Sequence, residues 1–294
     1  MMRSGFVSFV GRPNVGKSTL TNALVGEKIA ITSSKPQTTR HAIRGIINRD
    51  EGQLILVDTP GVHRPRTLLG ERLNALVQST LSDVDVIGMC FPADEPVGPG
   101  DAFINAELDK YPRALKVAIV TKTDVASSEQ IAQQLLTVSG LREWALVIPV
   151  SASNGENLET LARELTELLP AGQALYLEGE NTDGDMEKRV SELIRESILE
   201  GVHDELPHSL AVTIDDMSPR EDKDIIDIYA NVFVERDSQK AIIIGKGGAR
   251  LKEIGATSRS SIEALLGSQV YLNIRVKVAK DWQRDPKQLQ RLGF

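Results

Sequence analysis

The sequence contains almost no cysteine and no long apolar run. Cys90 is the single cysteine among 294 residues, so no internal disulfide can form and a reducing compartment is expected. Cys90 stands within the apolar run 86–91, which favours a small buried side chain over a nucleophile. No run approaches the roughly 20 apolar residues of a membrane-spanning helix, and we expect no signal peptide before the first apolar run. These features predict a cytoplasmic protein, at most peripheral on the inner face of the cell membrane.

The composition is that of an ordinary soluble globular protein, with 41% hydrophobic and 26% charged residues. The length predicts about two domains, each able to bury its own core. The net charge of −7 is unevenly distributed, because residues 236–294 hold 12 Lys/Arg against 5 Asp/Glu. A basic C-terminal fifth on an acidic body indicates a local site for a polyanion. The alternative is a solvated basic face without a ligand.

The N-terminal region is organised around one glycine-bounded loop. The apolar run 6–10 precedes the loop, and apolar residues at helical spacing follow it in 19–25. That order is the context of a G-x-x-x-x-G-K-[ST] phosphate loop rather than of a plain glycine turn. Its backbone N–H groups and the helix N-terminus can hold phosphate oxygens. The predicted phosphate-binding residues are Gly11, Arg12, Pro13, Asn14, Val15, Gly16, Lys17, Ser18 and Thr19.

Three oxygen-bearing side chains are predicted to hold Mg²⁺. The Ser18 hydroxyl can ligate the ion, and Asp58, at the carboxyl end of the apolar run 53–57, can hold it through water. The Ser- and Thr-rich loop 28–40 occupies the place of a switch. From it Thr39, or its neighbour Thr38, can offer a hydroxyl to Mg²⁺ and a backbone N–H to a γ-phosphate. A Thr-rich surface loop is the alternative reading of this segment.

Residues 58–61 have the composition of a turn, which is the alternative reading of this motif. Beside a phosphate loop, the motif and the residue after it predict nucleotide binding by Thr59, Pro60, Gly61 and Val62. The Gly61 N–H can approach a γ-phosphate without side-chain interference. Lys17 adds charge at the β- and γ-phosphates, so Lys17, Thr39 and Gly61 are the predicted catalytic residues. Val62 cannot orient a water molecule, and slow intrinsic hydrolysis is therefore expected.

Two further motifs, at 121–124 and 151–153, predict which nucleotide base is bound. An aspartate carboxylate can accept hydrogen bonds from the N1–H and N2–H₂ groups of guanine, whereas adenine offers no such pair of donors. The motif 121–124 follows an apolar strand, the aliphatic stem of its lysine can lie over the base, and backbone N–H groups of 151–153 can reach guanine O6. The predicted base-binding residues are Thr121, Lys122, Thr123, Asp124, Ser151, Ala152 and Ser153.

Strand and helix patterns alternate through this region, which predicts a mostly parallel sheet with helices on both faces. Ligand sites in such sheets lie at the carboxyl ends of the strands. Ser18, Asp58, Asp124 and Ser151 all follow predicted strands, so we expect them at one edge. Helices are also predicted over 67–81, 103–110 and 156–169.

The C-terminal region predicts a helix over 186–200, strands over 210–214, 225–235 and 270–278, and a mobile polar turn over 215–224. The apolar run 241–244 leads into a GXXG sequence and a basic amphipathic helix, the pattern of the KH loop that clamps single-stranded nucleic acid. An ordinary glycine turn between helices is the alternative. A short basic helix is expected over 281–294. The predicted RNA-binding residues are Ile244, Gly245, Lys246, Gly247, Gly248, Arg250 and Lys252.

Taken together, the N-terminal motifs resemble the five guanine-nucleotide motifs of translation-factor-related bacterial GTPases, and Gln37–His41 resembles the switch of the Era family. The helix–strand–strand–helix–helix–strand order is similar to the type-2 KH domain that ends Era proteins. The resemblance covers nearly the whole chain. It implies an α/β P-loop NTPase fold, with a Ras-like G domain at 4–173, a linker at 174–186 and a smaller α+β type-2 KH domain at 187–294 (core about 203–281).

The resemblance also implies a function. It implies a GTP-binding and GTP-hydrolysing switch, dependent on Mg²⁺, that binds 16S rRNA near its 3′ end and acts in assembly of the 30S ribosomal subunit. A potassium ion near Asn14 is implied as a second cofactor, and a monomer is expected. Thr121 stands where most of the family has asparagine; we expect guanine recognition to persist and contacts to the phosphate loop to loosen.

Two alternatives stay open. One is a membrane- or division-associated signalling GTPase that touches the cytoplasmic membrane peripherally. The other is a passive RNA-binding chaperone whose G domain is only structural.

Overall fold

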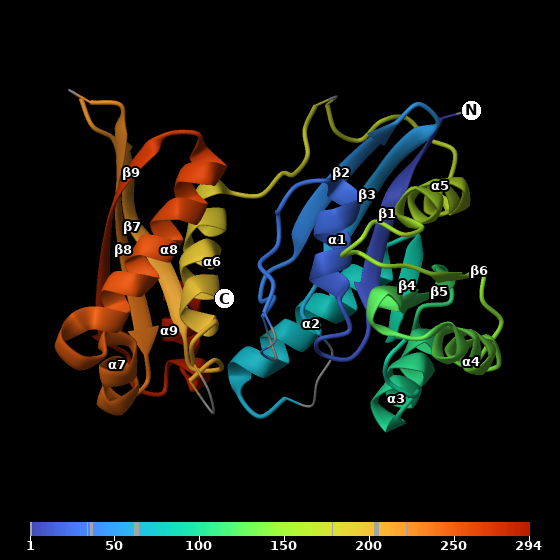
Figure 1. The fold of residues 1–294 in the computed structure, drawn as a ribbon, viewed down its shortest axis with the longest axis horizontal. Helices are drawn as coiled ribbons and strands as arrows, with labels where there is room; N and C mark the ends of the chain where they lie inside the picture. The colour runs from blue at the N-terminus through green and yellow to red at the C-terminus, as the bar shows by residue number, and fades with distance from the viewer. Residues whose placement is uncertain are drawn as a thin grey trace. The chain divides into compact units, whose positions relative to one another are not determined.

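The computed structural model describes residues 2–33, 35, 38–61, 65–177, 179–202, 206–221 and 223–294. The chain divides into two compact units, each with its own sheet (Figure 1). The first unit comprises Met1–Thr32, Thr39–Arg64 and Leu73–Asp183, and the second comprises Ser33–Thr38, Pro65–Arg72 and Gly184–Phe294.

The first unit is built on a six-stranded sheet with the order β2-β3-β1-β4-β5-β6. All neighbouring strands are parallel except β2, which pairs antiparallel with β3 at the sheet edge. The central strands are apolar throughout because both of their faces are covered. The strands are β1 (Arg3–Val10), β2 (Ile43–Arg49), β3 (Gly52–Asp58), β4 (Val86–Pro92), β5 (Leu115–Thr121) and β6 (Leu146–Pro149).

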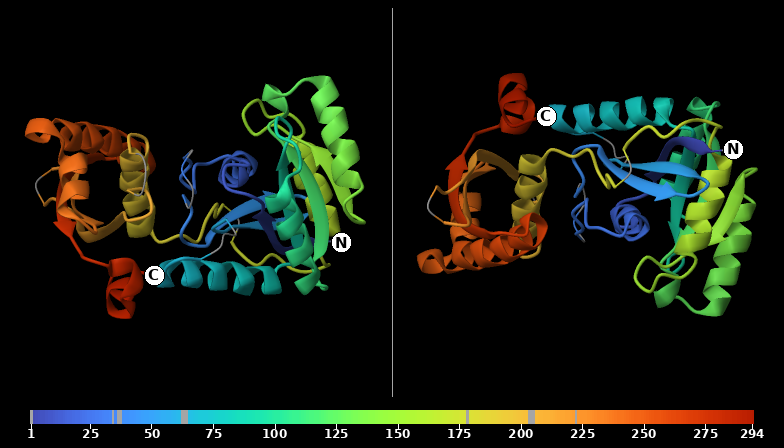
Figure 2. Two further views of the ribbon diagram at one scale, coloured as in Figure 1. Left: turned by 90° about the horizontal axis from the view of Figure 1, so that it is seen from below. Right: turned by 90° about the horizontal axis from the view of Figure 1, so that it is seen from above.

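Helices lie on both sides of this sheet (Figures 1 and 2). One apolar core joins the sheet to α1 and α5 through residues such as Leu20 and Leu165. A second core on the opposite face includes Val77, Ile104 and Val138 from the other three helices. The doubly covered parallel sheet predicted from the sequence is therefore confirmed. The helices are α1 (Lys17–Val25), α2 (Leu68–Asp83), α3 (Pro99–Glu107), α4 (Ser128–Ser139) and α5 (Leu158–Leu168).

Two of these helices differ from the sequence prediction. Helix α3 begins at Pro99 rather than at Phe103, because the Gly98 N–H donates to the Asp101 carboxylate at 2.9 Å and proline is suited to the first helical turn. Helix α4 was not singled out from the sequence. Its start is marked by a capping box between Ser127 and Gln130, in which each side chain bonds the backbone N–H of the other residue.

Residues 173–177 and 179–183, most of the predicted linker, are held against the first sheet. The Gln53 side chain accepts hydrogen bonds from the backbone N–H groups of Leu175 and Tyr176, at 2.7 and 2.9 Å. Its amide nitrogen donates to the Tyr176 carbonyl at 3.0 Å and to Asn48 at 2.7 Å. The side-chain amide of the buried Gln53 thus forms the hydrogen bonds with residues 175–176 that the backbone of a neighbouring strand would otherwise form.

Further along, the same segment is held by strand β2. The Ile46 N–H donates to the Asn181 carbonyl at 2.8 Å. Asp183 accepts from Arg44 at 2.8 Å and from the Tyr176 hydroxyl at 2.9 Å. Residues 173–183 are called the strap below.

The second unit contains a three-stranded sheet with the order β7-β8-β9, in which β7 is antiparallel and β9 parallel to β8. Helices α6 and α8 pack on one face of the sheet, and α7 lies next to α8 on the same side (Figure 1). The element order is the one predicted from the sequence. The elements are α6 (Met186–Leu199), β7 (Ala211–Pro219), β8 (Ile225–Val234), α7 (Asp237–Ile244), α8 (Ala249–Leu266) and β9 (Gln269–Val278).

The sequence predicts a mobile turn over 215–224, and this prediction is wrong for residues 215–219, which belong to a strand. Strand β7 continues to Pro219 and stays paired with β8, with a register shift between Ile214 and Asp216. One extra residue at this β-bulge allows residues 216–219 to continue the hydrogen-bonded pairing with β8. The polarity of this segment alone did not indicate a strand.

The predicted C-terminal helix is instead two short helices, η4 (Trp282–Arg284) and α9 (Pro286–Arg291). Asp285 separates them and caps α9 by accepting from the Lys287 N–H at 2.9 Å. Trp282 is fully buried, and its indole N–H donates to the Ser209 carbonyl at 3.1 Å. Within the described ranges, no helix combines the length and apolarity needed to cross a membrane.

We predict that Gln53→Leu frees the strap. The substitution keeps the side-chain size but leaves two backbone N–H groups without acceptors, so the cost of opening should fall by about 1–3 kcal/mol. Limited proteolysis should then cleave within 173–183 about tenfold faster or more. Gln133→Leu on the exposed side of α4 is the matched control. Equal cleavage of both variants would show that Gln53 does not hold the strap.

Candidate nucleotide site and RNA-binding loop

The phosphate loop connects β1 to α1 and adopts the backbone that only certain residues tolerate. Gly11, Asn14 and Gly16 have φ angles of 152°, 65° and 95°. The Lys17 amine donates to the carbonyls of Gly11 at 3.2 Å and Arg12 at 2.9 Å. The loop is therefore wrapped around a buried cation, next to the N-terminus of α1.

The three predicted magnesium-binding side chains meet at this loop. The Asp58 carboxylate accepts through one oxygen from Ser18 at 2.7 Å and from Thr39 at 3.2 Å, and the two hydroxyls lie 3.0 Å apart. The other oxygen of Asp58 is buried and has no hydrogen-bond partner among the described residues. Two hydroxyls and a carboxylate are ligands that Mg²⁺ prefers, so the residues fit this ion. Thr38 does not take part, because its hydroxyl donates to the Lys35 carbonyl.

Burial makes the charges of this site costly. It lowers the pKa of the Lys17 amine, against the opposing effect of Cys90 and Asp58. It also raises the pKa of Asp58, although hydrogen bonds from Ser18 and Thr39 and the charge of Lys17 oppose the shift. Cys90 lies beneath the loop, and burial raises its pKa to about 12, which fits the predicted inert thiol. An anion together with a divalent cation would compensate both charges.

The turn 58–61 faces the same loop. A Cβ atom on Gly61 would lie 3.6 Å from the Lys17 amine, so the Gly61 backbone is next to the predicted γ-phosphate position. The Thr59 hydroxyl is buried without a hydrogen-bond partner among the described residues, and Pro60 is buried beside it. Val62 lies outside the described residues.

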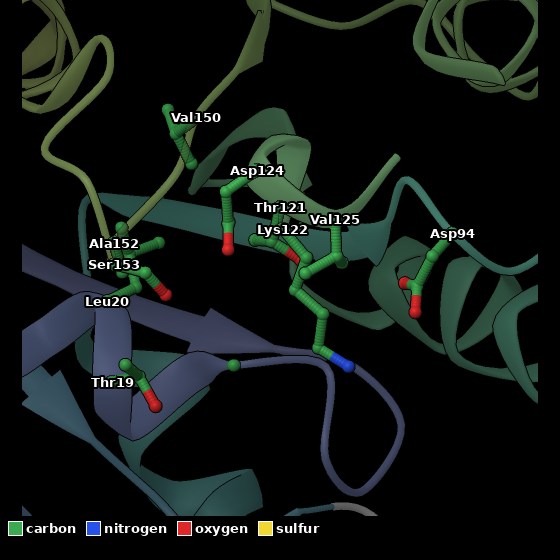
Figure 3. A pocket seen from close by; sticks show the side chains of 11 residues that line it. Thr19, Leu20, Asp94, Thr121, Lys122, Asp124, Val125, Val150, Ala152 and Ser153 are labelled. Atoms are coloured by element: carbon green, nitrogen blue, oxygen red, sulfur yellow. The ribbon is translucent and has the colours of Figure 1, made fainter. Parts of the chain in front are cut away.

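A cavity of about 440 Å³ lies where the base is expected (Figure 3). It joins the start of α1 to the ends of β5 and β6, segments far apart in the sequence. Four of its lining residues were not predicted from the sequence: Leu20, Asp94, Val125 and Val150. Of these, only Asp94 could have been identified as a candidate, because it is a polar residue just after the carboxyl end of β4. The lining residues are Gly16, Thr19, Leu20, Asp94, Thr121, Lys122, Asp124, Val125, Val150, Ala152 and Ser153.

The carboxylate of Asp124 is oriented within this cavity. The Ser151 hydroxyl donates to it at 2.6 Å and itself accepts from the Ser153 N–H at 3.2 Å. The Ser151 N–H donates to the Glu156 carbonyl. Of the three backbone donors predicted for guanine O6, two are thus already used. The Ala152 N–H has no hydrogen-bond partner in the described part of the chain, so of the three predicted donors it is the one left available for O6.

The Thr123 side chain, predicted to bind the base, is bonded to another loop of the protein. Its hydroxyl donates to the Glu156 carboxylate at 2.7 Å and so ties the 121–124 motif to the 151–157 loop. Lys122, with φ of 59°, lines the cavity as predicted. Glu156 is a residue that sequence reasoning missed, because its role depends on two loops meeting.

Thr121 contacts the phosphate loop directly. Its buried hydroxyl donates to the Val15 carbonyl at 2.7 Å and lies 3.4 Å from the Phe91 carbonyl. Threonine at this position thus supplies one donor to the phosphate loop from the end of β5. This bond links the base-binding motif to the phosphate-binding motif.

The Arg12 side chain points away from the predicted phosphate position. Its guanidinium donates to the fully buried Asp101 at 2.9 Å and lies 3.1 Å from Glu95. Burial opposes the charge, but Asp101 and Glu95 outweigh it and raise the pKa of Arg12. Arg12 thus anchors the loop to α3, and only its backbone remains a candidate for phosphate binding. Asp101 was not predicted, because no local pattern distinguishes it from a surface acid.

The GXXG sequence forms the tight turn between α7 and α8. Gly245, Gly247 and Gly248 have φ angles of 71°, 61° and 79°. Lys246 and Lys252 are exposed, as an RNA contact requires, and Ile244 is half-buried. Gly248 is the N-cap of α8, so backbone N–H groups at this turn can bind phosphate. This geometry fits the predicted RNA clamp.

Arg250, also predicted to bind RNA, is already bonded within the protein. Its guanidinium donates to the Gly201 carbonyl, just beyond the end of α6. The side chain is used to bind the last turn of a helix, where a cation also interacts favourably with the helix dipole.

Comparisons with known proteins agree with a nucleotide site in the first unit and a KH loop in the second. The 50S ribosome-binding GTPase family matches residues 6–122, and the KH domain family matches residues 205–283. Fold and site define a P-loop GTPase joined to a KH domain, as predicted, and the predicted fold class is confirmed.

The whole chain has close relatives. GTPase Era of Leifsonia xyli subsp. xyli is 72% identical over 293 residues, covering 99% of each chain. GTPase Era of Mycobacterium sp. (strain JLS) is 63% identical over 295 residues, with the same coverage. The chain belongs to the Era family of GTPases.

Two solved structures also match over the full length. Era in complex with MgGDPNP and nucleotides 1506–1542 of 16S ribosomal RNA is 34% identical, with a TM-score of 0.95, covering 100% of this chain and 99% of that one. A variant of Aquifex aeolicus Era bound to GDP·AlF4⁻ has the same identity and TM-score, covering 99% of both chains.

We predict that Thr121→Val weakens nucleotide binding. Valine keeps the shape of threonine but leaves the buried Val15 carbonyl without a donor, at a cost of about 1–3 kcal/mol. The dissociation constant of a fluorescent GDP analogue should rise about tenfold. Thr121→Ser keeps the hydroxyl and should bind close to the wild type. Unchanged affinity in the valine variant would mean that this hydrogen bond does not hold the loop.

Proposed function

We propose that this GTPase is a switch that binds 16S rRNA near its 3′ end and acts in the assembly of the 30S ribosomal subunit in the cytoplasm. The observation that supports this best is the presence, on one chain, of a guanine-nucleotide site and a GXXG turn with exposed lysines. The relative solved with nucleotides 1506–1542 of 16S ribosomal RNA supports the choice of RNA.

In the proposed site, each part of GTP has a partner in this chain. Asp124 accepts from the guanine ring, Ala152 donates to O6, and the stem of Lys122 covers the base. The backbone of 11–16 and the Lys17 amine hold the β- and γ-phosphates. Ser18, Thr39 and Asp58 would hold Mg²⁺, which, when bound, offsets charge on the phosphate oxygens.

The proposed switch depends on contacts that exist only with a γ-phosphate. The backbone N–H groups of Thr39 and Gly61 bind the γ-phosphate, and the Lys17 amine stabilises the charge that develops during hydrolysis. Loss of that phosphate removes both backbone contacts at once. The segments that contain Thr39 and Gly61 then become less ordered, so their conformation differs between the GTP-bound and GDP-bound protein.

Of the two alternatives, neither is favoured by an observation. A passive RNA chaperone would have no need for buried Lys17 and Asp58, which are costly unless a ligand compensates them. A membrane-associated signalling role has no support from the described residues. That the protein acts as a monomer stays a prediction.

The test is GTP turnover by the full-length protein in potassium buffer, with and without single-stranded RNA from the 16S 3′ end. We expect the RNA to stimulate turnover and Gly247→Asp to abolish the stimulation while basal turnover persists. A Cβ at Gly247 meets nothing within 4 Å, and aspartate tolerates its φ of 61°, so the fold should survive.

The matched control is Gly247→Asn, which has the same shape without the negative charge and should retain most of the stimulation. Turnover that ignores RNA in the wild type would contradict the proposed switch. Stimulation that survives Gly247→Asp would contradict the role of the GXXG turn.

We also propose that a potassium ion near Asn14 compensates for the apolar Val62 during hydrolysis. Turnover in potassium should exceed turnover in sodium for the wild type. Asn14→Gly, which suits the φ of 65°, should turn over equally slowly in both salts. Asn14→Asp keeps a side-chain oxygen and should retain the dependence. A potassium effect that persists in Asn14→Gly would place the ion elsewhere.

A further inference from the structure

Helix α6 of the second unit is buried on two sides. Val190, Ile194 and Ile198 form an apolar stripe along it, and the helix packs on β7 and α8 (Figure 1). Arg195 and Leu199 recur on the opposite side of the helix, and both are buried as well. A helix that covers a sheet normally presents that second side to water. A buried arginine there indicates that other residues of the same unit cover it.

Thr38 is part of this cover. Its segment, Ser33–Thr38, belongs to the second unit, although it comes from the G-domain part of the sequence. The Arg195 guanidinium donates to the Thr38 carbonyl. Glu192, one turn earlier on α6, accepts from the same guanidinium at 2.8 and 2.5 Å. The side chain of Arg195 is only 2% exposed, so these charge-assisted bonds are shielded from water. The Thr38 carbonyl is thus held by an arginine that is itself fixed.

The held carbonyl adjoins a predicted ligand of the nucleotide. The Thr38 carbonyl and the Thr39 N–H belong to one planar peptide unit and point in opposite directions, so fixing the carbonyl also fixes the N–H. Thr39 is buried, and its hydroxyl lies 3.0 Å from that of Ser18 and 3.2 Å from the Asp58 carboxylate. Its N–H has no hydrogen-bond partner among the described residues, which leaves it available for a phosphate oxygen.

We propose that Arg195 is a positioning residue for GTP hydrolysis. By holding the Thr38 carbonyl, it keeps the Thr39 N–H and hydroxyl where the γ-phosphate and Mg²⁺ need them, so less order has to be gained when GTP binds. GDP has no γ-phosphate and does not depend on this contact. The inference rests on the proposed role of Thr39, and it adds a residue of the second unit, outside the nucleotide motifs, to the machinery of hydrolysis.

The experiment uses the full-length protein without RNA. It measures single-turnover GTP hydrolysis and the dissociation constants of GDP and of a non-hydrolysable GTP analogue. The side chain of Arg195→Gln can still donate to Glu192 but is too short to reach Thr38 as well. Hydrolysis should slow about tenfold and binding of the GTP analogue should weaken by a similar factor, because a charge-assisted hydrogen bond is lost. The GDP dissociation constant should be unchanged, which also reports an intact fold.

Arg72→Gln is the matched control. Arg72 also donates to a backbone carbonyl within the second unit, that of Phe294 at 2.6 Å, but no predicted nucleotide-binding residue adjoins that carbonyl. This variant should hydrolyse GTP like the wild type. As a second variant, Arg195→Met fills the buried space without a donor and should behave like Arg195→Gln.

Three results would overturn the inference. The first is hydrolysis at the wild-type rate in both Arg195 variants. The second is an equal loss of affinity for GDP and for the GTP analogue, which would indicate a merely structural role. The third is a loss of the same size in Arg72→Gln, because a general loosening of the second unit would then explain both variants.

Thr39→Ala separates this inference from the proposed function. It removes the hydroxyl that would hold Mg²⁺ and should slow hydrolysis at least as much as Arg195→Gln. If Thr39→Ala and the Arg195 variants all keep the wild-type rate, the proposed role of Thr39 is wrong and the inference falls with it. If Thr39→Ala is slow and the Arg195 variants are not, only the positioning by Arg195 is wrong. Because RNA is absent, neither result depends on stimulation by RNA.

Discussion

The structure depends on two buried opposite charges, Lys17 and Asp58, which attract each other but are not hydrogen-bonded to each other. Within the described residues, the Lys17 amine is bonded to two loop carbonyls and one Asp58 oxygen has no hydrogen-bond partner. Buried charges of this kind are tolerated where a ligand completes them. The sheet, the glycine-bounded loop and the hydroxyls of Ser18 and Thr39 can all be understood as the frame that holds this incomplete site open for a phosphate and its metal ion.

The nucleotide site is stiffened by bonds between its loops. Thr121 joins the base motif to the phosphate loop, Thr123 joins it to the 151–157 loop, and Arg12 joins the phosphate loop to α3 through Asp101. Each of these side chains was assigned to the nucleotide from the sequence, and each uses its polar atoms to bond the protein. Preorganisation of this kind reduces the entropy lost when the ligand binds.

The second unit shows how a charge excess is divided by the fold. Lys246 and Lys252 lie beside the GXXG turn, Arg250 binds the end of α6, and Arg275 is exposed on β9, away from that turn. Basic residues that form one block in the sequence therefore have different surroundings in the fold, and at least one of them is bonded within the protein.

The sequence by itself determined the fold class and the motif residues, because phosphate loops and KH turns need particular residue types at fixed local spacing. Local patterns also predicted which strands are buried. Tertiary structure decided the rest, since it depends on partners distant in the chain: Asp101 with Arg12, Glu156 with Thr123, Gly201 with Arg250, and Gln53 with the strap. It also decided that β7 continues through a polar segment, because pairing with β8 supplies hydrogen bonds that no local pattern reveals.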